Sequence, residues 1–200
     1  MLIGEMLDLR PVTAADAKLL SEWFNDPEYL GPFFSVTPHS EAEWEKDLSS
    51  ETPSSDENTA YLITRRDADE PLGLIGHMNP FTNDEYHGRE IWYQVHPRFR
   101  RKGIARQAAS LLVNHLFDST PVERIEAKVV VGNEASCRVL EGAGMQYEGI
   151  LRRVVFLHGR YVDLHVYSII RKEWGGEKSY RAARRPFSGS ASSRWSSSAT

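Results

Sequence analysis

The stretch Arg100-Arg101-Lys102-Gly103-Ile104-Ala105 decides how this chain of 200 residues is organised. It follows a strand-like run, Glu90 to Val95, and leads into a helix-like run from Ile104 to Phe117. A strand that turns directly into a helix aims several free backbone N–H groups at one point, where the helix dipole also favours an anion. Gly103 has no Cβ to keep a phosphate away from the backbone, and the preceding basic residues add positive charge. The stretch therefore predicts a cradle for a pyrophosphate.

Two other phosphate-binding loops do not fit this spacing. A Walker loop needs a second glycine upstream and Lys-Ser/Thr after the last glycine, and a dinucleotide loop needs three glycines. Gly142 and Gly144 do not supply such a loop, because they end a helical run instead of opening one. The alternative that stays open is an ordinary strand-to-helix turn with solvated charges.

Arg100, Gly103 and Ala105 match in order the pattern Arg/Gln-x-x-Gly-x-Gly/Ala, so the stretch resembles the acyl-CoA signature of the GNAT acetyltransferase superfamily. The resemblance implies a strand before the loop that carries a bulge, with backbone groups near residues 94–96 pairing with the pantetheine arm and polarising the thioester carbonyl. It implies acetyl-CoA as co-substrate. The cofactor-binding residues would be Val95, His96, Pro97, Arg100, Arg101, Lys102, Gly103, Ile104, Ala105 and Asn133.

The pattern of apolar residues predicts the elements around this loop. Thr13 to Asp16 reads as a capping box that opens a helix, which ends at Asn25-Asp26-Pro27. His158-Gly159-Arg160 reads as a hairpin turn, and Ser49 to Asn58 as a polar loop. The other helices are expected at 41–48, 104–117 and 134–143, and the strands at 7–12, 60–64, 72–78, 89–95, 124–131, 150–157 and 161–170.

This order resembles that of the GNAT fold. The predicted class is therefore α+β (mixed α/β), with a central twisted mixed β-sheet that is splayed at its middle strands and flanked by helices. The run 124–131 is nearly continuously apolar, which is typical of a buried parallel strand. The N-terminal region is expected to supply residues of the acceptor pocket, and about half of its aromatic residues should instead belong to the core. The candidates are Trp23, Phe24, Asn25, Asp26, Tyr29, Phe33, Phe34 and Trp44.

Asn133-Glu134-Ala135-Ser136 is similar to the Asn-x-x-Ser motif of the RimJ/RimL branch, and the segments 149–152 and 159–174 resemble that branch as well. The resemblance implies that Asn133 contacts the pantetheine and that Ser136 lies near the thioester sulfur. Leu140 occupies the position where many GNAT enzymes carry a tyrosine general acid. The proton donor would then be Ser136 or water, or none would be needed, and Tyr147 is a more distant substitute. Cys137 reads as inert packing.

Glu90 is the candidate catalytic base, because an amine must lose a proton before it can attack a thioester. It opens the strand that leads into the loop, a position where several GNAT enzymes carry a glutamate. Glu90 would act directly or by orienting a water molecule; the alternative is a solvated carboxylate paired with a basic residue. His87 and His96 are lesser candidates, since a lone histidine is more often structural.

Composition narrows the range of partners. The formal net charge is −4; from Gly175 onward there are five basic residues and one acidic residue, so residues 1–174 carry −8. An acidic body argues against nucleic-acid binding, and it suits an amine substrate. The single cysteine excludes an internal disulfide and a cysteine-rich zinc site, and we predict no metal. No signal peptide or membrane span is recognisable, so we expect a cytoplasmic protein, for which a homodimer is one compatible state.

The sequence thus predicts a GNAT N-acetyltransferase domain over residues 1–174 and a disordered Ser/Arg-rich tail over 175–200. The reaction would be transfer of an acetyl group to a primary amine, by direct attack in a ternary complex, with Glu90 and Ser136 as catalytic residues. The acceptor would be a protein N-terminus or a small-molecule amine, such as an antibiotic or polyamine. A non-catalytic acyl-CoA-binding module is the alternative from another class, and nucleic-acid association through the basic tail is a weaker one.

Overall fold

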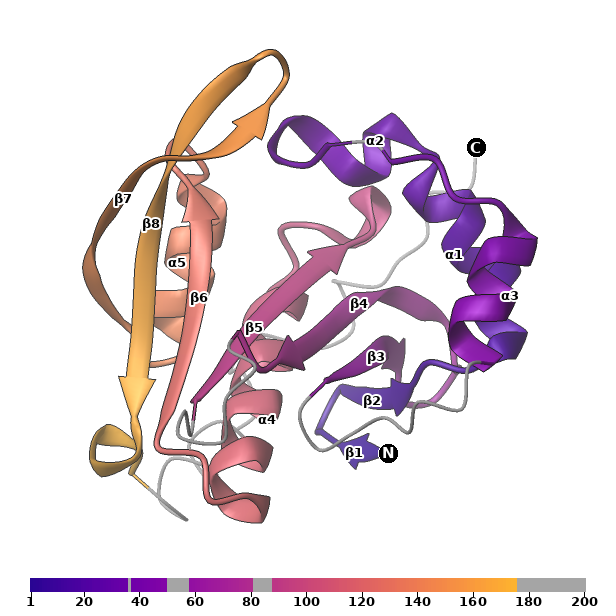
Figure 1. Ribbon diagram of the computed structural model, residues 1–200. Helices are drawn as coiled ribbons and strands as arrows, with labels where there is room; N and C mark the ends of the chain where they lie inside the picture. Colours follow the sequence, from indigo (N-terminus) through magenta and orange to yellow (C-terminus); the bar gives the residue numbers. More distant parts are fainter. Residues whose placement is uncertain (36, 50–57, 81–87, 176–200) are drawn as a thin grey trace.

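The computed structural model describes residues 1–35, 37–49, 58–80 and 88–175. Within these residues one sheet of eight strands has the order β1-β2-β3-β4-β5-β6-β8-β7 (Figure 1). Neighbouring strands are antiparallel except β5 and β6, which are parallel. The strands are β1 (Leu2–Ile3), β2 (Leu7–Pro11), β3 (Thr59–Arg65), β4 (Pro71–Met78), β5 (Gly88–Val95), β6 (Arg124–Val130), β7 (Gln146–Leu157) and β8 (Arg160–Ile170).

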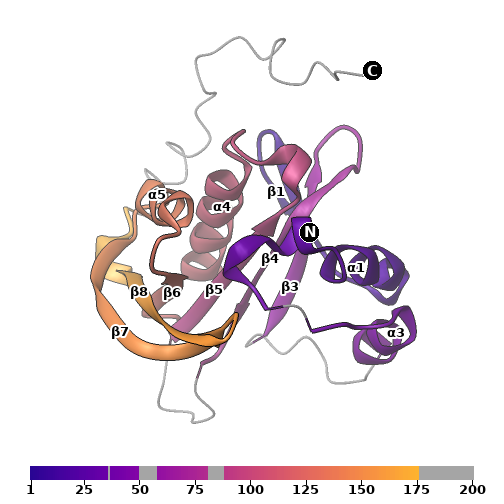
Figure 2. The same ribbon diagram turned by 90° about the horizontal axis from the view of Figure 1, so that it is seen from above.

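Helices cover both faces of the sheet (Figure 2). One core lies between the sheet and α4 and α5, and a second lies between the sheet and the N-terminal helices, where Trp23 and Tyr29 are buried. The α-helices are α1 (Ala17–Phe24), α2 (Pro27–Leu30), α3 (Glu41–Ser49), α4 (Ile104–Ser119) and α5 (Glu134–Gly142). Four short 3₁₀ helices complete the described chain: η1 (Ala14–Asp16), η2 (Gly31–Phe33), η3 (Pro97–Phe99) and η4 (Arg171–Glu173).

The two halves of the sheet separate in its middle. β5 and β6 pair over only three positions, ending at Glu90 opposite Glu126. Beyond that pair the strands diverge, as Figure 1 shows, while β5 continues to Val95 and β6 to Val130. The predicted splayed sheet is therefore confirmed. In both views the β7–β8 turn comes near the α2–η2 segment, above the gap between the two strands.

The predicted order of elements is confirmed, with differences that have local causes. β1 and α2 were not predicted, because two and four residues are too few to show a periodicity. The interpretation of β6 as a buried strand is wrong: its residues alternate between buried and half-buried. The odd-numbered residues lie in the core under α4 and α5, and the even-numbered ones, which are charged from Arg124 to Lys128, lie on the opposite face. Of the predicted Ser49–Asn58 loop and C-terminal tail, residues 50–57 and 176–200 lie outside the described residues.

Local signals explain where several elements begin and end. The Asp16 carboxylate accepts hydrogen bonds from the Thr13 backbone N–H at 2.8 Å and from the Arg10 guanidinium, so the predicted capping box is present. The turn between β7 and β8 consists of His158 and Gly159, both with positive φ, as a two-residue hairpin requires.

No helix in the described ranges is long and apolar enough to span a membrane.

Candidate active site

Backbone groups along the second half of β5 face the gap in the sheet. The His96 N–H donates to the Leu72 carbonyl at 2.9 Å, so the even-numbered residues of β5 exchange hydrogen bonds with β4. Because bonding sides alternate along an antiparallel strand, the odd-numbered residues direct theirs toward β6. The Val95 carbonyl accepts from Arg100 Nε at 2.9 Å. The N–H and C=O of Tyr93 and the N–H of Val95 are therefore presented to the gap.

The strand that carries these groups is regular. The β4–β5 ladder runs from Gly73 opposite Val95 to Met78 opposite Glu90 without a shift of register. The expected bulge in this strand is therefore absent from the ladder, and that prediction is wrong. The splay itself exposes the backbone edge, because β6 leaves β5 after Glu90.

The loop from Arg100 to Ala105, which we call the phosphate loop, has the backbone shape of an anion site. Arg101 has φ +64° and Gly103 has φ +78°, and left-handed residues in a turn direct successive N–H groups to one side. The first helical bond of α4 runs from the Gln107 N–H to the Gly103 carbonyl, so the N–H groups of residues 104–106 have no helical partner. No side chain caps this end of α4, and Gly103 is exposed. The residues present fit a pyrophosphate.

The Arg100 side chain is turned away from the phosphate loop, unlike our expectation. Its guanidinium donates to the carbonyls of Glu28 and Tyr29, at the end of α2, and its backbone N–H donates to Pro97. Gln94 Nε2 also donates to the Tyr29 carbonyl. Arg100 therefore joins α2 to β5. The positive charge beside the phosphate loop comes from Arg101, which is exposed, and from Lys102, whose Nζ also lies 5.7 Å from the Phe99 ring centroid.

His96 belongs to an aromatic cluster on the α1–α2 side. Its ring lies 5.5 Å from that of Trp23 and 6.0 Å from that of Tyr29, and its Nδ1 accepts from the Arg98 N–H at 3.4 Å. Burial lowers the pKa of His96, and the positive charge of Arg98 lowers it further. Its imidazole is thus packed beside aromatic rings. Pro97 begins η3, and the side chains of Val95 and Ile104 are buried, so only the backbone of those two is available to a ligand.

Ser136 lies at the start of α5 and contacts β5 across the gap. The Asn133 side chain accepts from the Ser136 N–H at 3.2 Å, so the predicted N-cap is confirmed. Ser136 Oγ lies 2.6 Å from the Tyr93 hydroxyl. Leu140, at the position of the expected tyrosine acid, is fully buried in the core, and Cys137 is buried beside it. The hydroxyl pair is thus the polar group that this part of α5 presents to β5.

Glu90 is held by an ion pair on the opposite face of the sheet. Lys128 Nζ lies 2.6 Å from Glu90 Oε2 and 3.4 Å from Glu126 Oε1. Burial lowers the pKa of Lys128, but the hydrogen bond to Glu90 and the negative charge of Glu90 and Glu126 outweigh it and raise the pKa above its usual value. Arg124 continues the network to Glu126 at 3.3 Å and to Glu148 at 2.9 Å. His87, the other candidate base, lies outside the described residues.

Aromatic residues line the same face farther along β5. Trp92 packs against the second core, as Phe24 and Trp44 also do. It lies across Gly76 of β4, where a Cβ would approach the indole to 2.5 Å, so this packing requires glycine. Of the aromatic residues expected near the acceptor, Trp23 and Tyr29 belong to the core, and Phe34 remains exposed. The face thus has an apolar part near the end of β5 and a charged part where the sheet begins to open.

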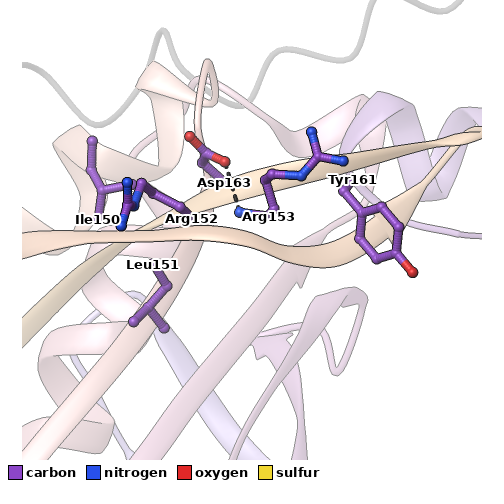
Figure 3. Close-up of a pocket in the computed structure, with 6 residues that line it drawn as sticks. All are labelled: Ile150, Leu151, Arg152, Arg153, Tyr161 and Asp163. Atoms are coloured by element: carbon purple, nitrogen blue, oxygen red, sulfur yellow. Dashed lines mark hydrogen bonds between the residues drawn. The ribbon is translucent and has the colours of Figure 1, made fainter.

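The β7–β8 hairpin carries an open hollow of about 790 Å³ near its turn. Arg153 adopts φ +54°, and its N–H donates to Asp163 at 2.8 Å. Figure 3 shows these two residues above the strand with Ile150 and Arg152, and Leu151 on the other side. The register shift between Leu151 and Val155 creates this arrangement. The residues that line the hollow include none of the phosphate loop and none of the predicted catalytic residues.

Three residues of the site were missed by the sequence analysis: Tyr93, Gln94 as a side chain, and Lys128. Alternation along β5 places Tyr93 on the helix face and Glu90 on the other face, and this signal was available. The sequence did not show which residues these side chains contact, because Ser136 is 43 positions from Tyr93 and Lys128 is 38 positions from Glu90.

Comparison with known proteins identifies relatives over most of the chain. Residues 6–146 match the family model of the acetyltransferase (GNAT) domain. An uncharacterized N-acetyltransferase, p20, from Bacillus licheniformis is 30% identical over 179 residues, which cover 88% of this chain and 98% of the relative. A putative ribosomal N-acetyltransferase, YdaF, from Bacillus subtilis (strain 168) is 36% identical over 89 residues, or 44% of this chain and 49% of the relative.

A solved structure shares the same fold. RimJ from Mycobacterium smegmatis, in complex with CoA-disulfide, superposes with a TM-score of 0.77 at 26% identity. The match covers 89% of this chain and 90% of the other.

Proposed function

The chain belongs to the GNAT acetyltransferase family, and we propose that it transfers an acetyl group from acetyl-CoA to the α-amine of a peptide N-terminus. The observation that carries the proposal is the presence of two separate sets of backbone groups, those of Tyr93 and Val95 on the opened edge of β5 and the N–H groups at the N-terminus of α4. The first set suits an extended pantetheine arm, and the second suits a pyrophosphate. The RimJ structure of the same fold is a CoA-disulfide complex, which supports this assignment.

Acetyl-CoA supplies an acetyl thioester when bound. The N–H groups of residues 103–106, with Arg101 and Lys102, would hold its phosphates, and the Tyr93 and Val95 backbone would hold the arm. We assign the Val95 N–H to the acyl oxygen; an oriented backbone donor of this kind contributes a few kcal/mol to a transition state. Ser136 Oγ would donate to the sulfur. Asn133 would act by capping α5 and so holding Ser136 in place.

We assign proton removal to Glu90 through water. Glu90, Trp92 and Gln94 share one face of β5, on the side of the N-terminal helices. Five residues of strand separate Glu90 from Val95, which is roughly 16 Å, so a proton must cross ordered water to reach the carboxylate. Lys128 holds that carboxylate in one orientation from 2.6 Å. The role of Glu90 is therefore to accept a proton delivered along this face.

The charges on this face favour an acceptor with one positive charge over a polyamine. Glu90, Glu126 and Glu148 share two cations, Lys128 and Arg124, within 3.4 Å or less. A polyamine carries several ammonium groups and needs carboxylates without a cation of their own. The apolar surface of Trp92 and Phe34 suits a peptide side chain, and YdaF carries the name of a putative ribosomal acetyltransferase.

A thiol-release assay with acetyl-CoA tests the proposal. Peptides with free N-termini should release CoA, whereas the same peptides blocked at the N-terminus but containing lysine should not. Spermidine and an aminoglycoside serve as the competing acceptor classes, and Gly103→Glu serves as the variant with a damaged phosphate loop. Faster turnover of a polyamine or aminoglycoside would replace the proposed acceptor, and binding of acetyl-CoA without turnover of any amine would favour the binding-module alternative. Cytoplasmic location and homodimer formation stay predictions.

A further inference from the structure

The proposed chemistry uses only the backbone of Tyr93, yet the Tyr93 hydroxyl contacts Ser136, the one side chain assigned to the sulfur. We propose that Tyr93 is a positioning residue: it donates its hydrogen to Ser136 Oγ and so leaves the Ser136 hydrogen to point toward the cofactor sulfur. This inference rests on the proposed function, since it takes Ser136 to lie beside the sulfur. Many GNAT enzymes protonate the sulfur with a tyrosine at the position that Leu140 occupies here, and Leu140 is buried in the core. The proposal gives part of that role to a tyrosine of β5 instead.

Tyr93 and Ser136 meet on the face of the sheet that α4 and α5 cover. Tyr93 projects from β5 toward α5 and packs against the core that α4 and α5 cover. Its hydroxyl lies 2.6 Å from Ser136 Oγ and 3.2 Å from the Ser136 carbonyl oxygen. The Ser136 backbone is in turn held by Asn133 at the N-terminus of α5. Both ends of the hydrogen bond are therefore fixed before a ligand arrives.

Either hydroxyl can be the donor in this bond, and the proposal takes Tyr93 as the donor. Each hydroxyl has one hydrogen, so one of the two donates to the other. If Ser136 donated to Tyr93, its hydrogen would be unavailable to sulfur, and Tyr93 would donate to the Ser136 carbonyl, which already lies within the hydrogen-bonded helix α5. If Tyr93 donates to Ser136 Oγ, the shorter contact is used and the Ser136 hydrogen is left over. A donor chain of this kind also polarises the terminal O–H.

The environment keeps the Tyr93 phenol protonated. Burial raises the pKa of Tyr93; the hydrogen bond with Ser136 opposes this, and the nearby Cys137 adds to it. The charged and titratable groups of α5 near the pair are Glu134, Cys137, Arg138 and Glu141. On β8, Tyr167 interacts with Cys137 and Glu141. A neutral phenol keeps its hydrogen, so Tyr93 can donate it to Ser136 Oγ as the proposal requires.

The role of Tyr93 can be tested without an acceptor amine, by comparing the affinity of the protein for CoA with its affinity for acetyl-CoA. Only CoA has a thiol that ionises; acetyl-CoA, a thioester, has none. If Ser136 donates to sulfur, the thiolate binds more tightly than the thiol, so the affinity ratio of CoA to acetyl-CoA should rise at least about tenfold between pH 6.5 and 9.5. Calorimetric titration at several pH values gives this ratio. In Tyr93→Phe and in Ser136→Ala the rise should fall below about twofold, with the acetyl-CoA affinity retained.

Tyr167→Phe is the matched control. It removes another tyrosine hydroxyl near α5, one that donates to Glu141 at 3.2 Å, and should keep the full pH-dependent rise. The double variant Tyr93→Phe/Ser136→Ala should behave like either single variant, because the two residues act as one unit. In turnover, Tyr93→Phe should lower kcat about tenfold at unchanged KM for acetyl-CoA, and should have no effect in the Ser136→Ala background.

Three results would overturn the inference. If Tyr93→Phe keeps the full rise while Ser136→Ala loses it, Ser136 acts without Tyr93. Both variants keeping the rise would mean that the pair does not face the sulfur. Equal loss of CoA and acetyl-CoA affinity in Tyr93→Phe would mean that Tyr93 only supports the fold. Failure of peptide acetylation in the wild type, with the binding pattern intact, would instead remove the proposed acceptor and leave this inference standing.

Discussion

Replacing Gly103 with glutamate tests the phosphate loop most directly. The glycine is exposed, has φ +78°, and a Cβ there would meet only the Gln107 side chain, at 3.9 Å. The substituted side chain therefore has room, and the fold should be retained. The left-handed backbone costs a non-glycine residue about 1–2 kcal/mol of stability. Its carboxylate would stand at the N-terminus of α4, where the structure favours an anion.

The expected loss of affinity follows from Coulomb's law. At about 6 Å and an effective dielectric between 20 and 80, one pair of like charges costs about 0.7–2.8 kcal/mol. Two phosphate charges double this, and a middle value of about 3 kcal/mol weakens the acetyl-CoA Kd roughly 100-fold. Isothermal titration at low salt measures the change, and added salt should reduce it, because the Debye length is about 8 Å at 0.15 M.

Two matched variants separate charge from strain. Gly103→Gln has the same bulk and backbone strain without the charge, and should lose roughly 10-fold less affinity than Gly103→Glu. Gly159→Glu places the same charge on a glycine with φ +81° in the β7–β8 turn, with nothing within 4 Å of its Cβ, and should bind acetyl-CoA normally. Unchanged Kd in Gly103→Glu, or equal loss in Gly159→Glu, would refute the assignment of the phosphate loop.

Three further predictions concern the groups around this loop. Glu90→Gln should lower kcat roughly 100-fold near neutral pH, with partial recovery at high pH where the free amine is present, and a full rate across a pH profile would exclude Glu90. Arg100→Gln should lower the melting temperature and raise the acceptor KM, with less effect on the acetyl-CoA Kd than Arg101→Gln; the reverse order in titration would place the Arg100 side chain on the cofactor. Burial raises the pKa of Asp16, but hydrogen bonds from Arg10 and the Thr13 cap outweigh it and lower the pKa. Its stabilisation is therefore complete above the unfolded pKa of about 3.9 and is lost as pH falls through the lower folded value, so Asp16→Asn should cost about 1 kcal/mol at pH 7 in thermal melts and little near pH 2.

Local signals in the sequence were sufficient where neighbouring residues decide the structure. The phosphate loop needs only a strand, a glycine that adopts positive φ, and a helix start, all within about fifteen residues. The Asn133 cap of α5 and the Asp16 cap before α1 are likewise contacts over three positions. Such features depend on backbone geometry that the nearby residues set by themselves. The two caps and the strand-to-helix turn were predicted correctly, and phosphate binding by the loop stays a prediction.

Side-chain roles depended on contacts that no local pattern encodes. Arg100 lies in a motif that suggested cofactor contact, but its guanidinium reaches Tyr29, 71 positions away. The backbone edge of β5 could be exposed by a bulge or by separation from β6, and the twist and register of the whole sheet decide which. In the structure the two strands separate.

The sequence by itself therefore determined the family, the order of the elements, the phosphate loop and the start of α5. Only the tertiary structure decided that Glu90 pairs with Lys128, that Tyr93 meets Ser136, and that the carboxylates of Glu90, Glu126 and Glu148 share two cations. The physical reason is that a side chain's direction follows from the local backbone, whereas its partner is set by which strands and helices the long-range register brings across the gap.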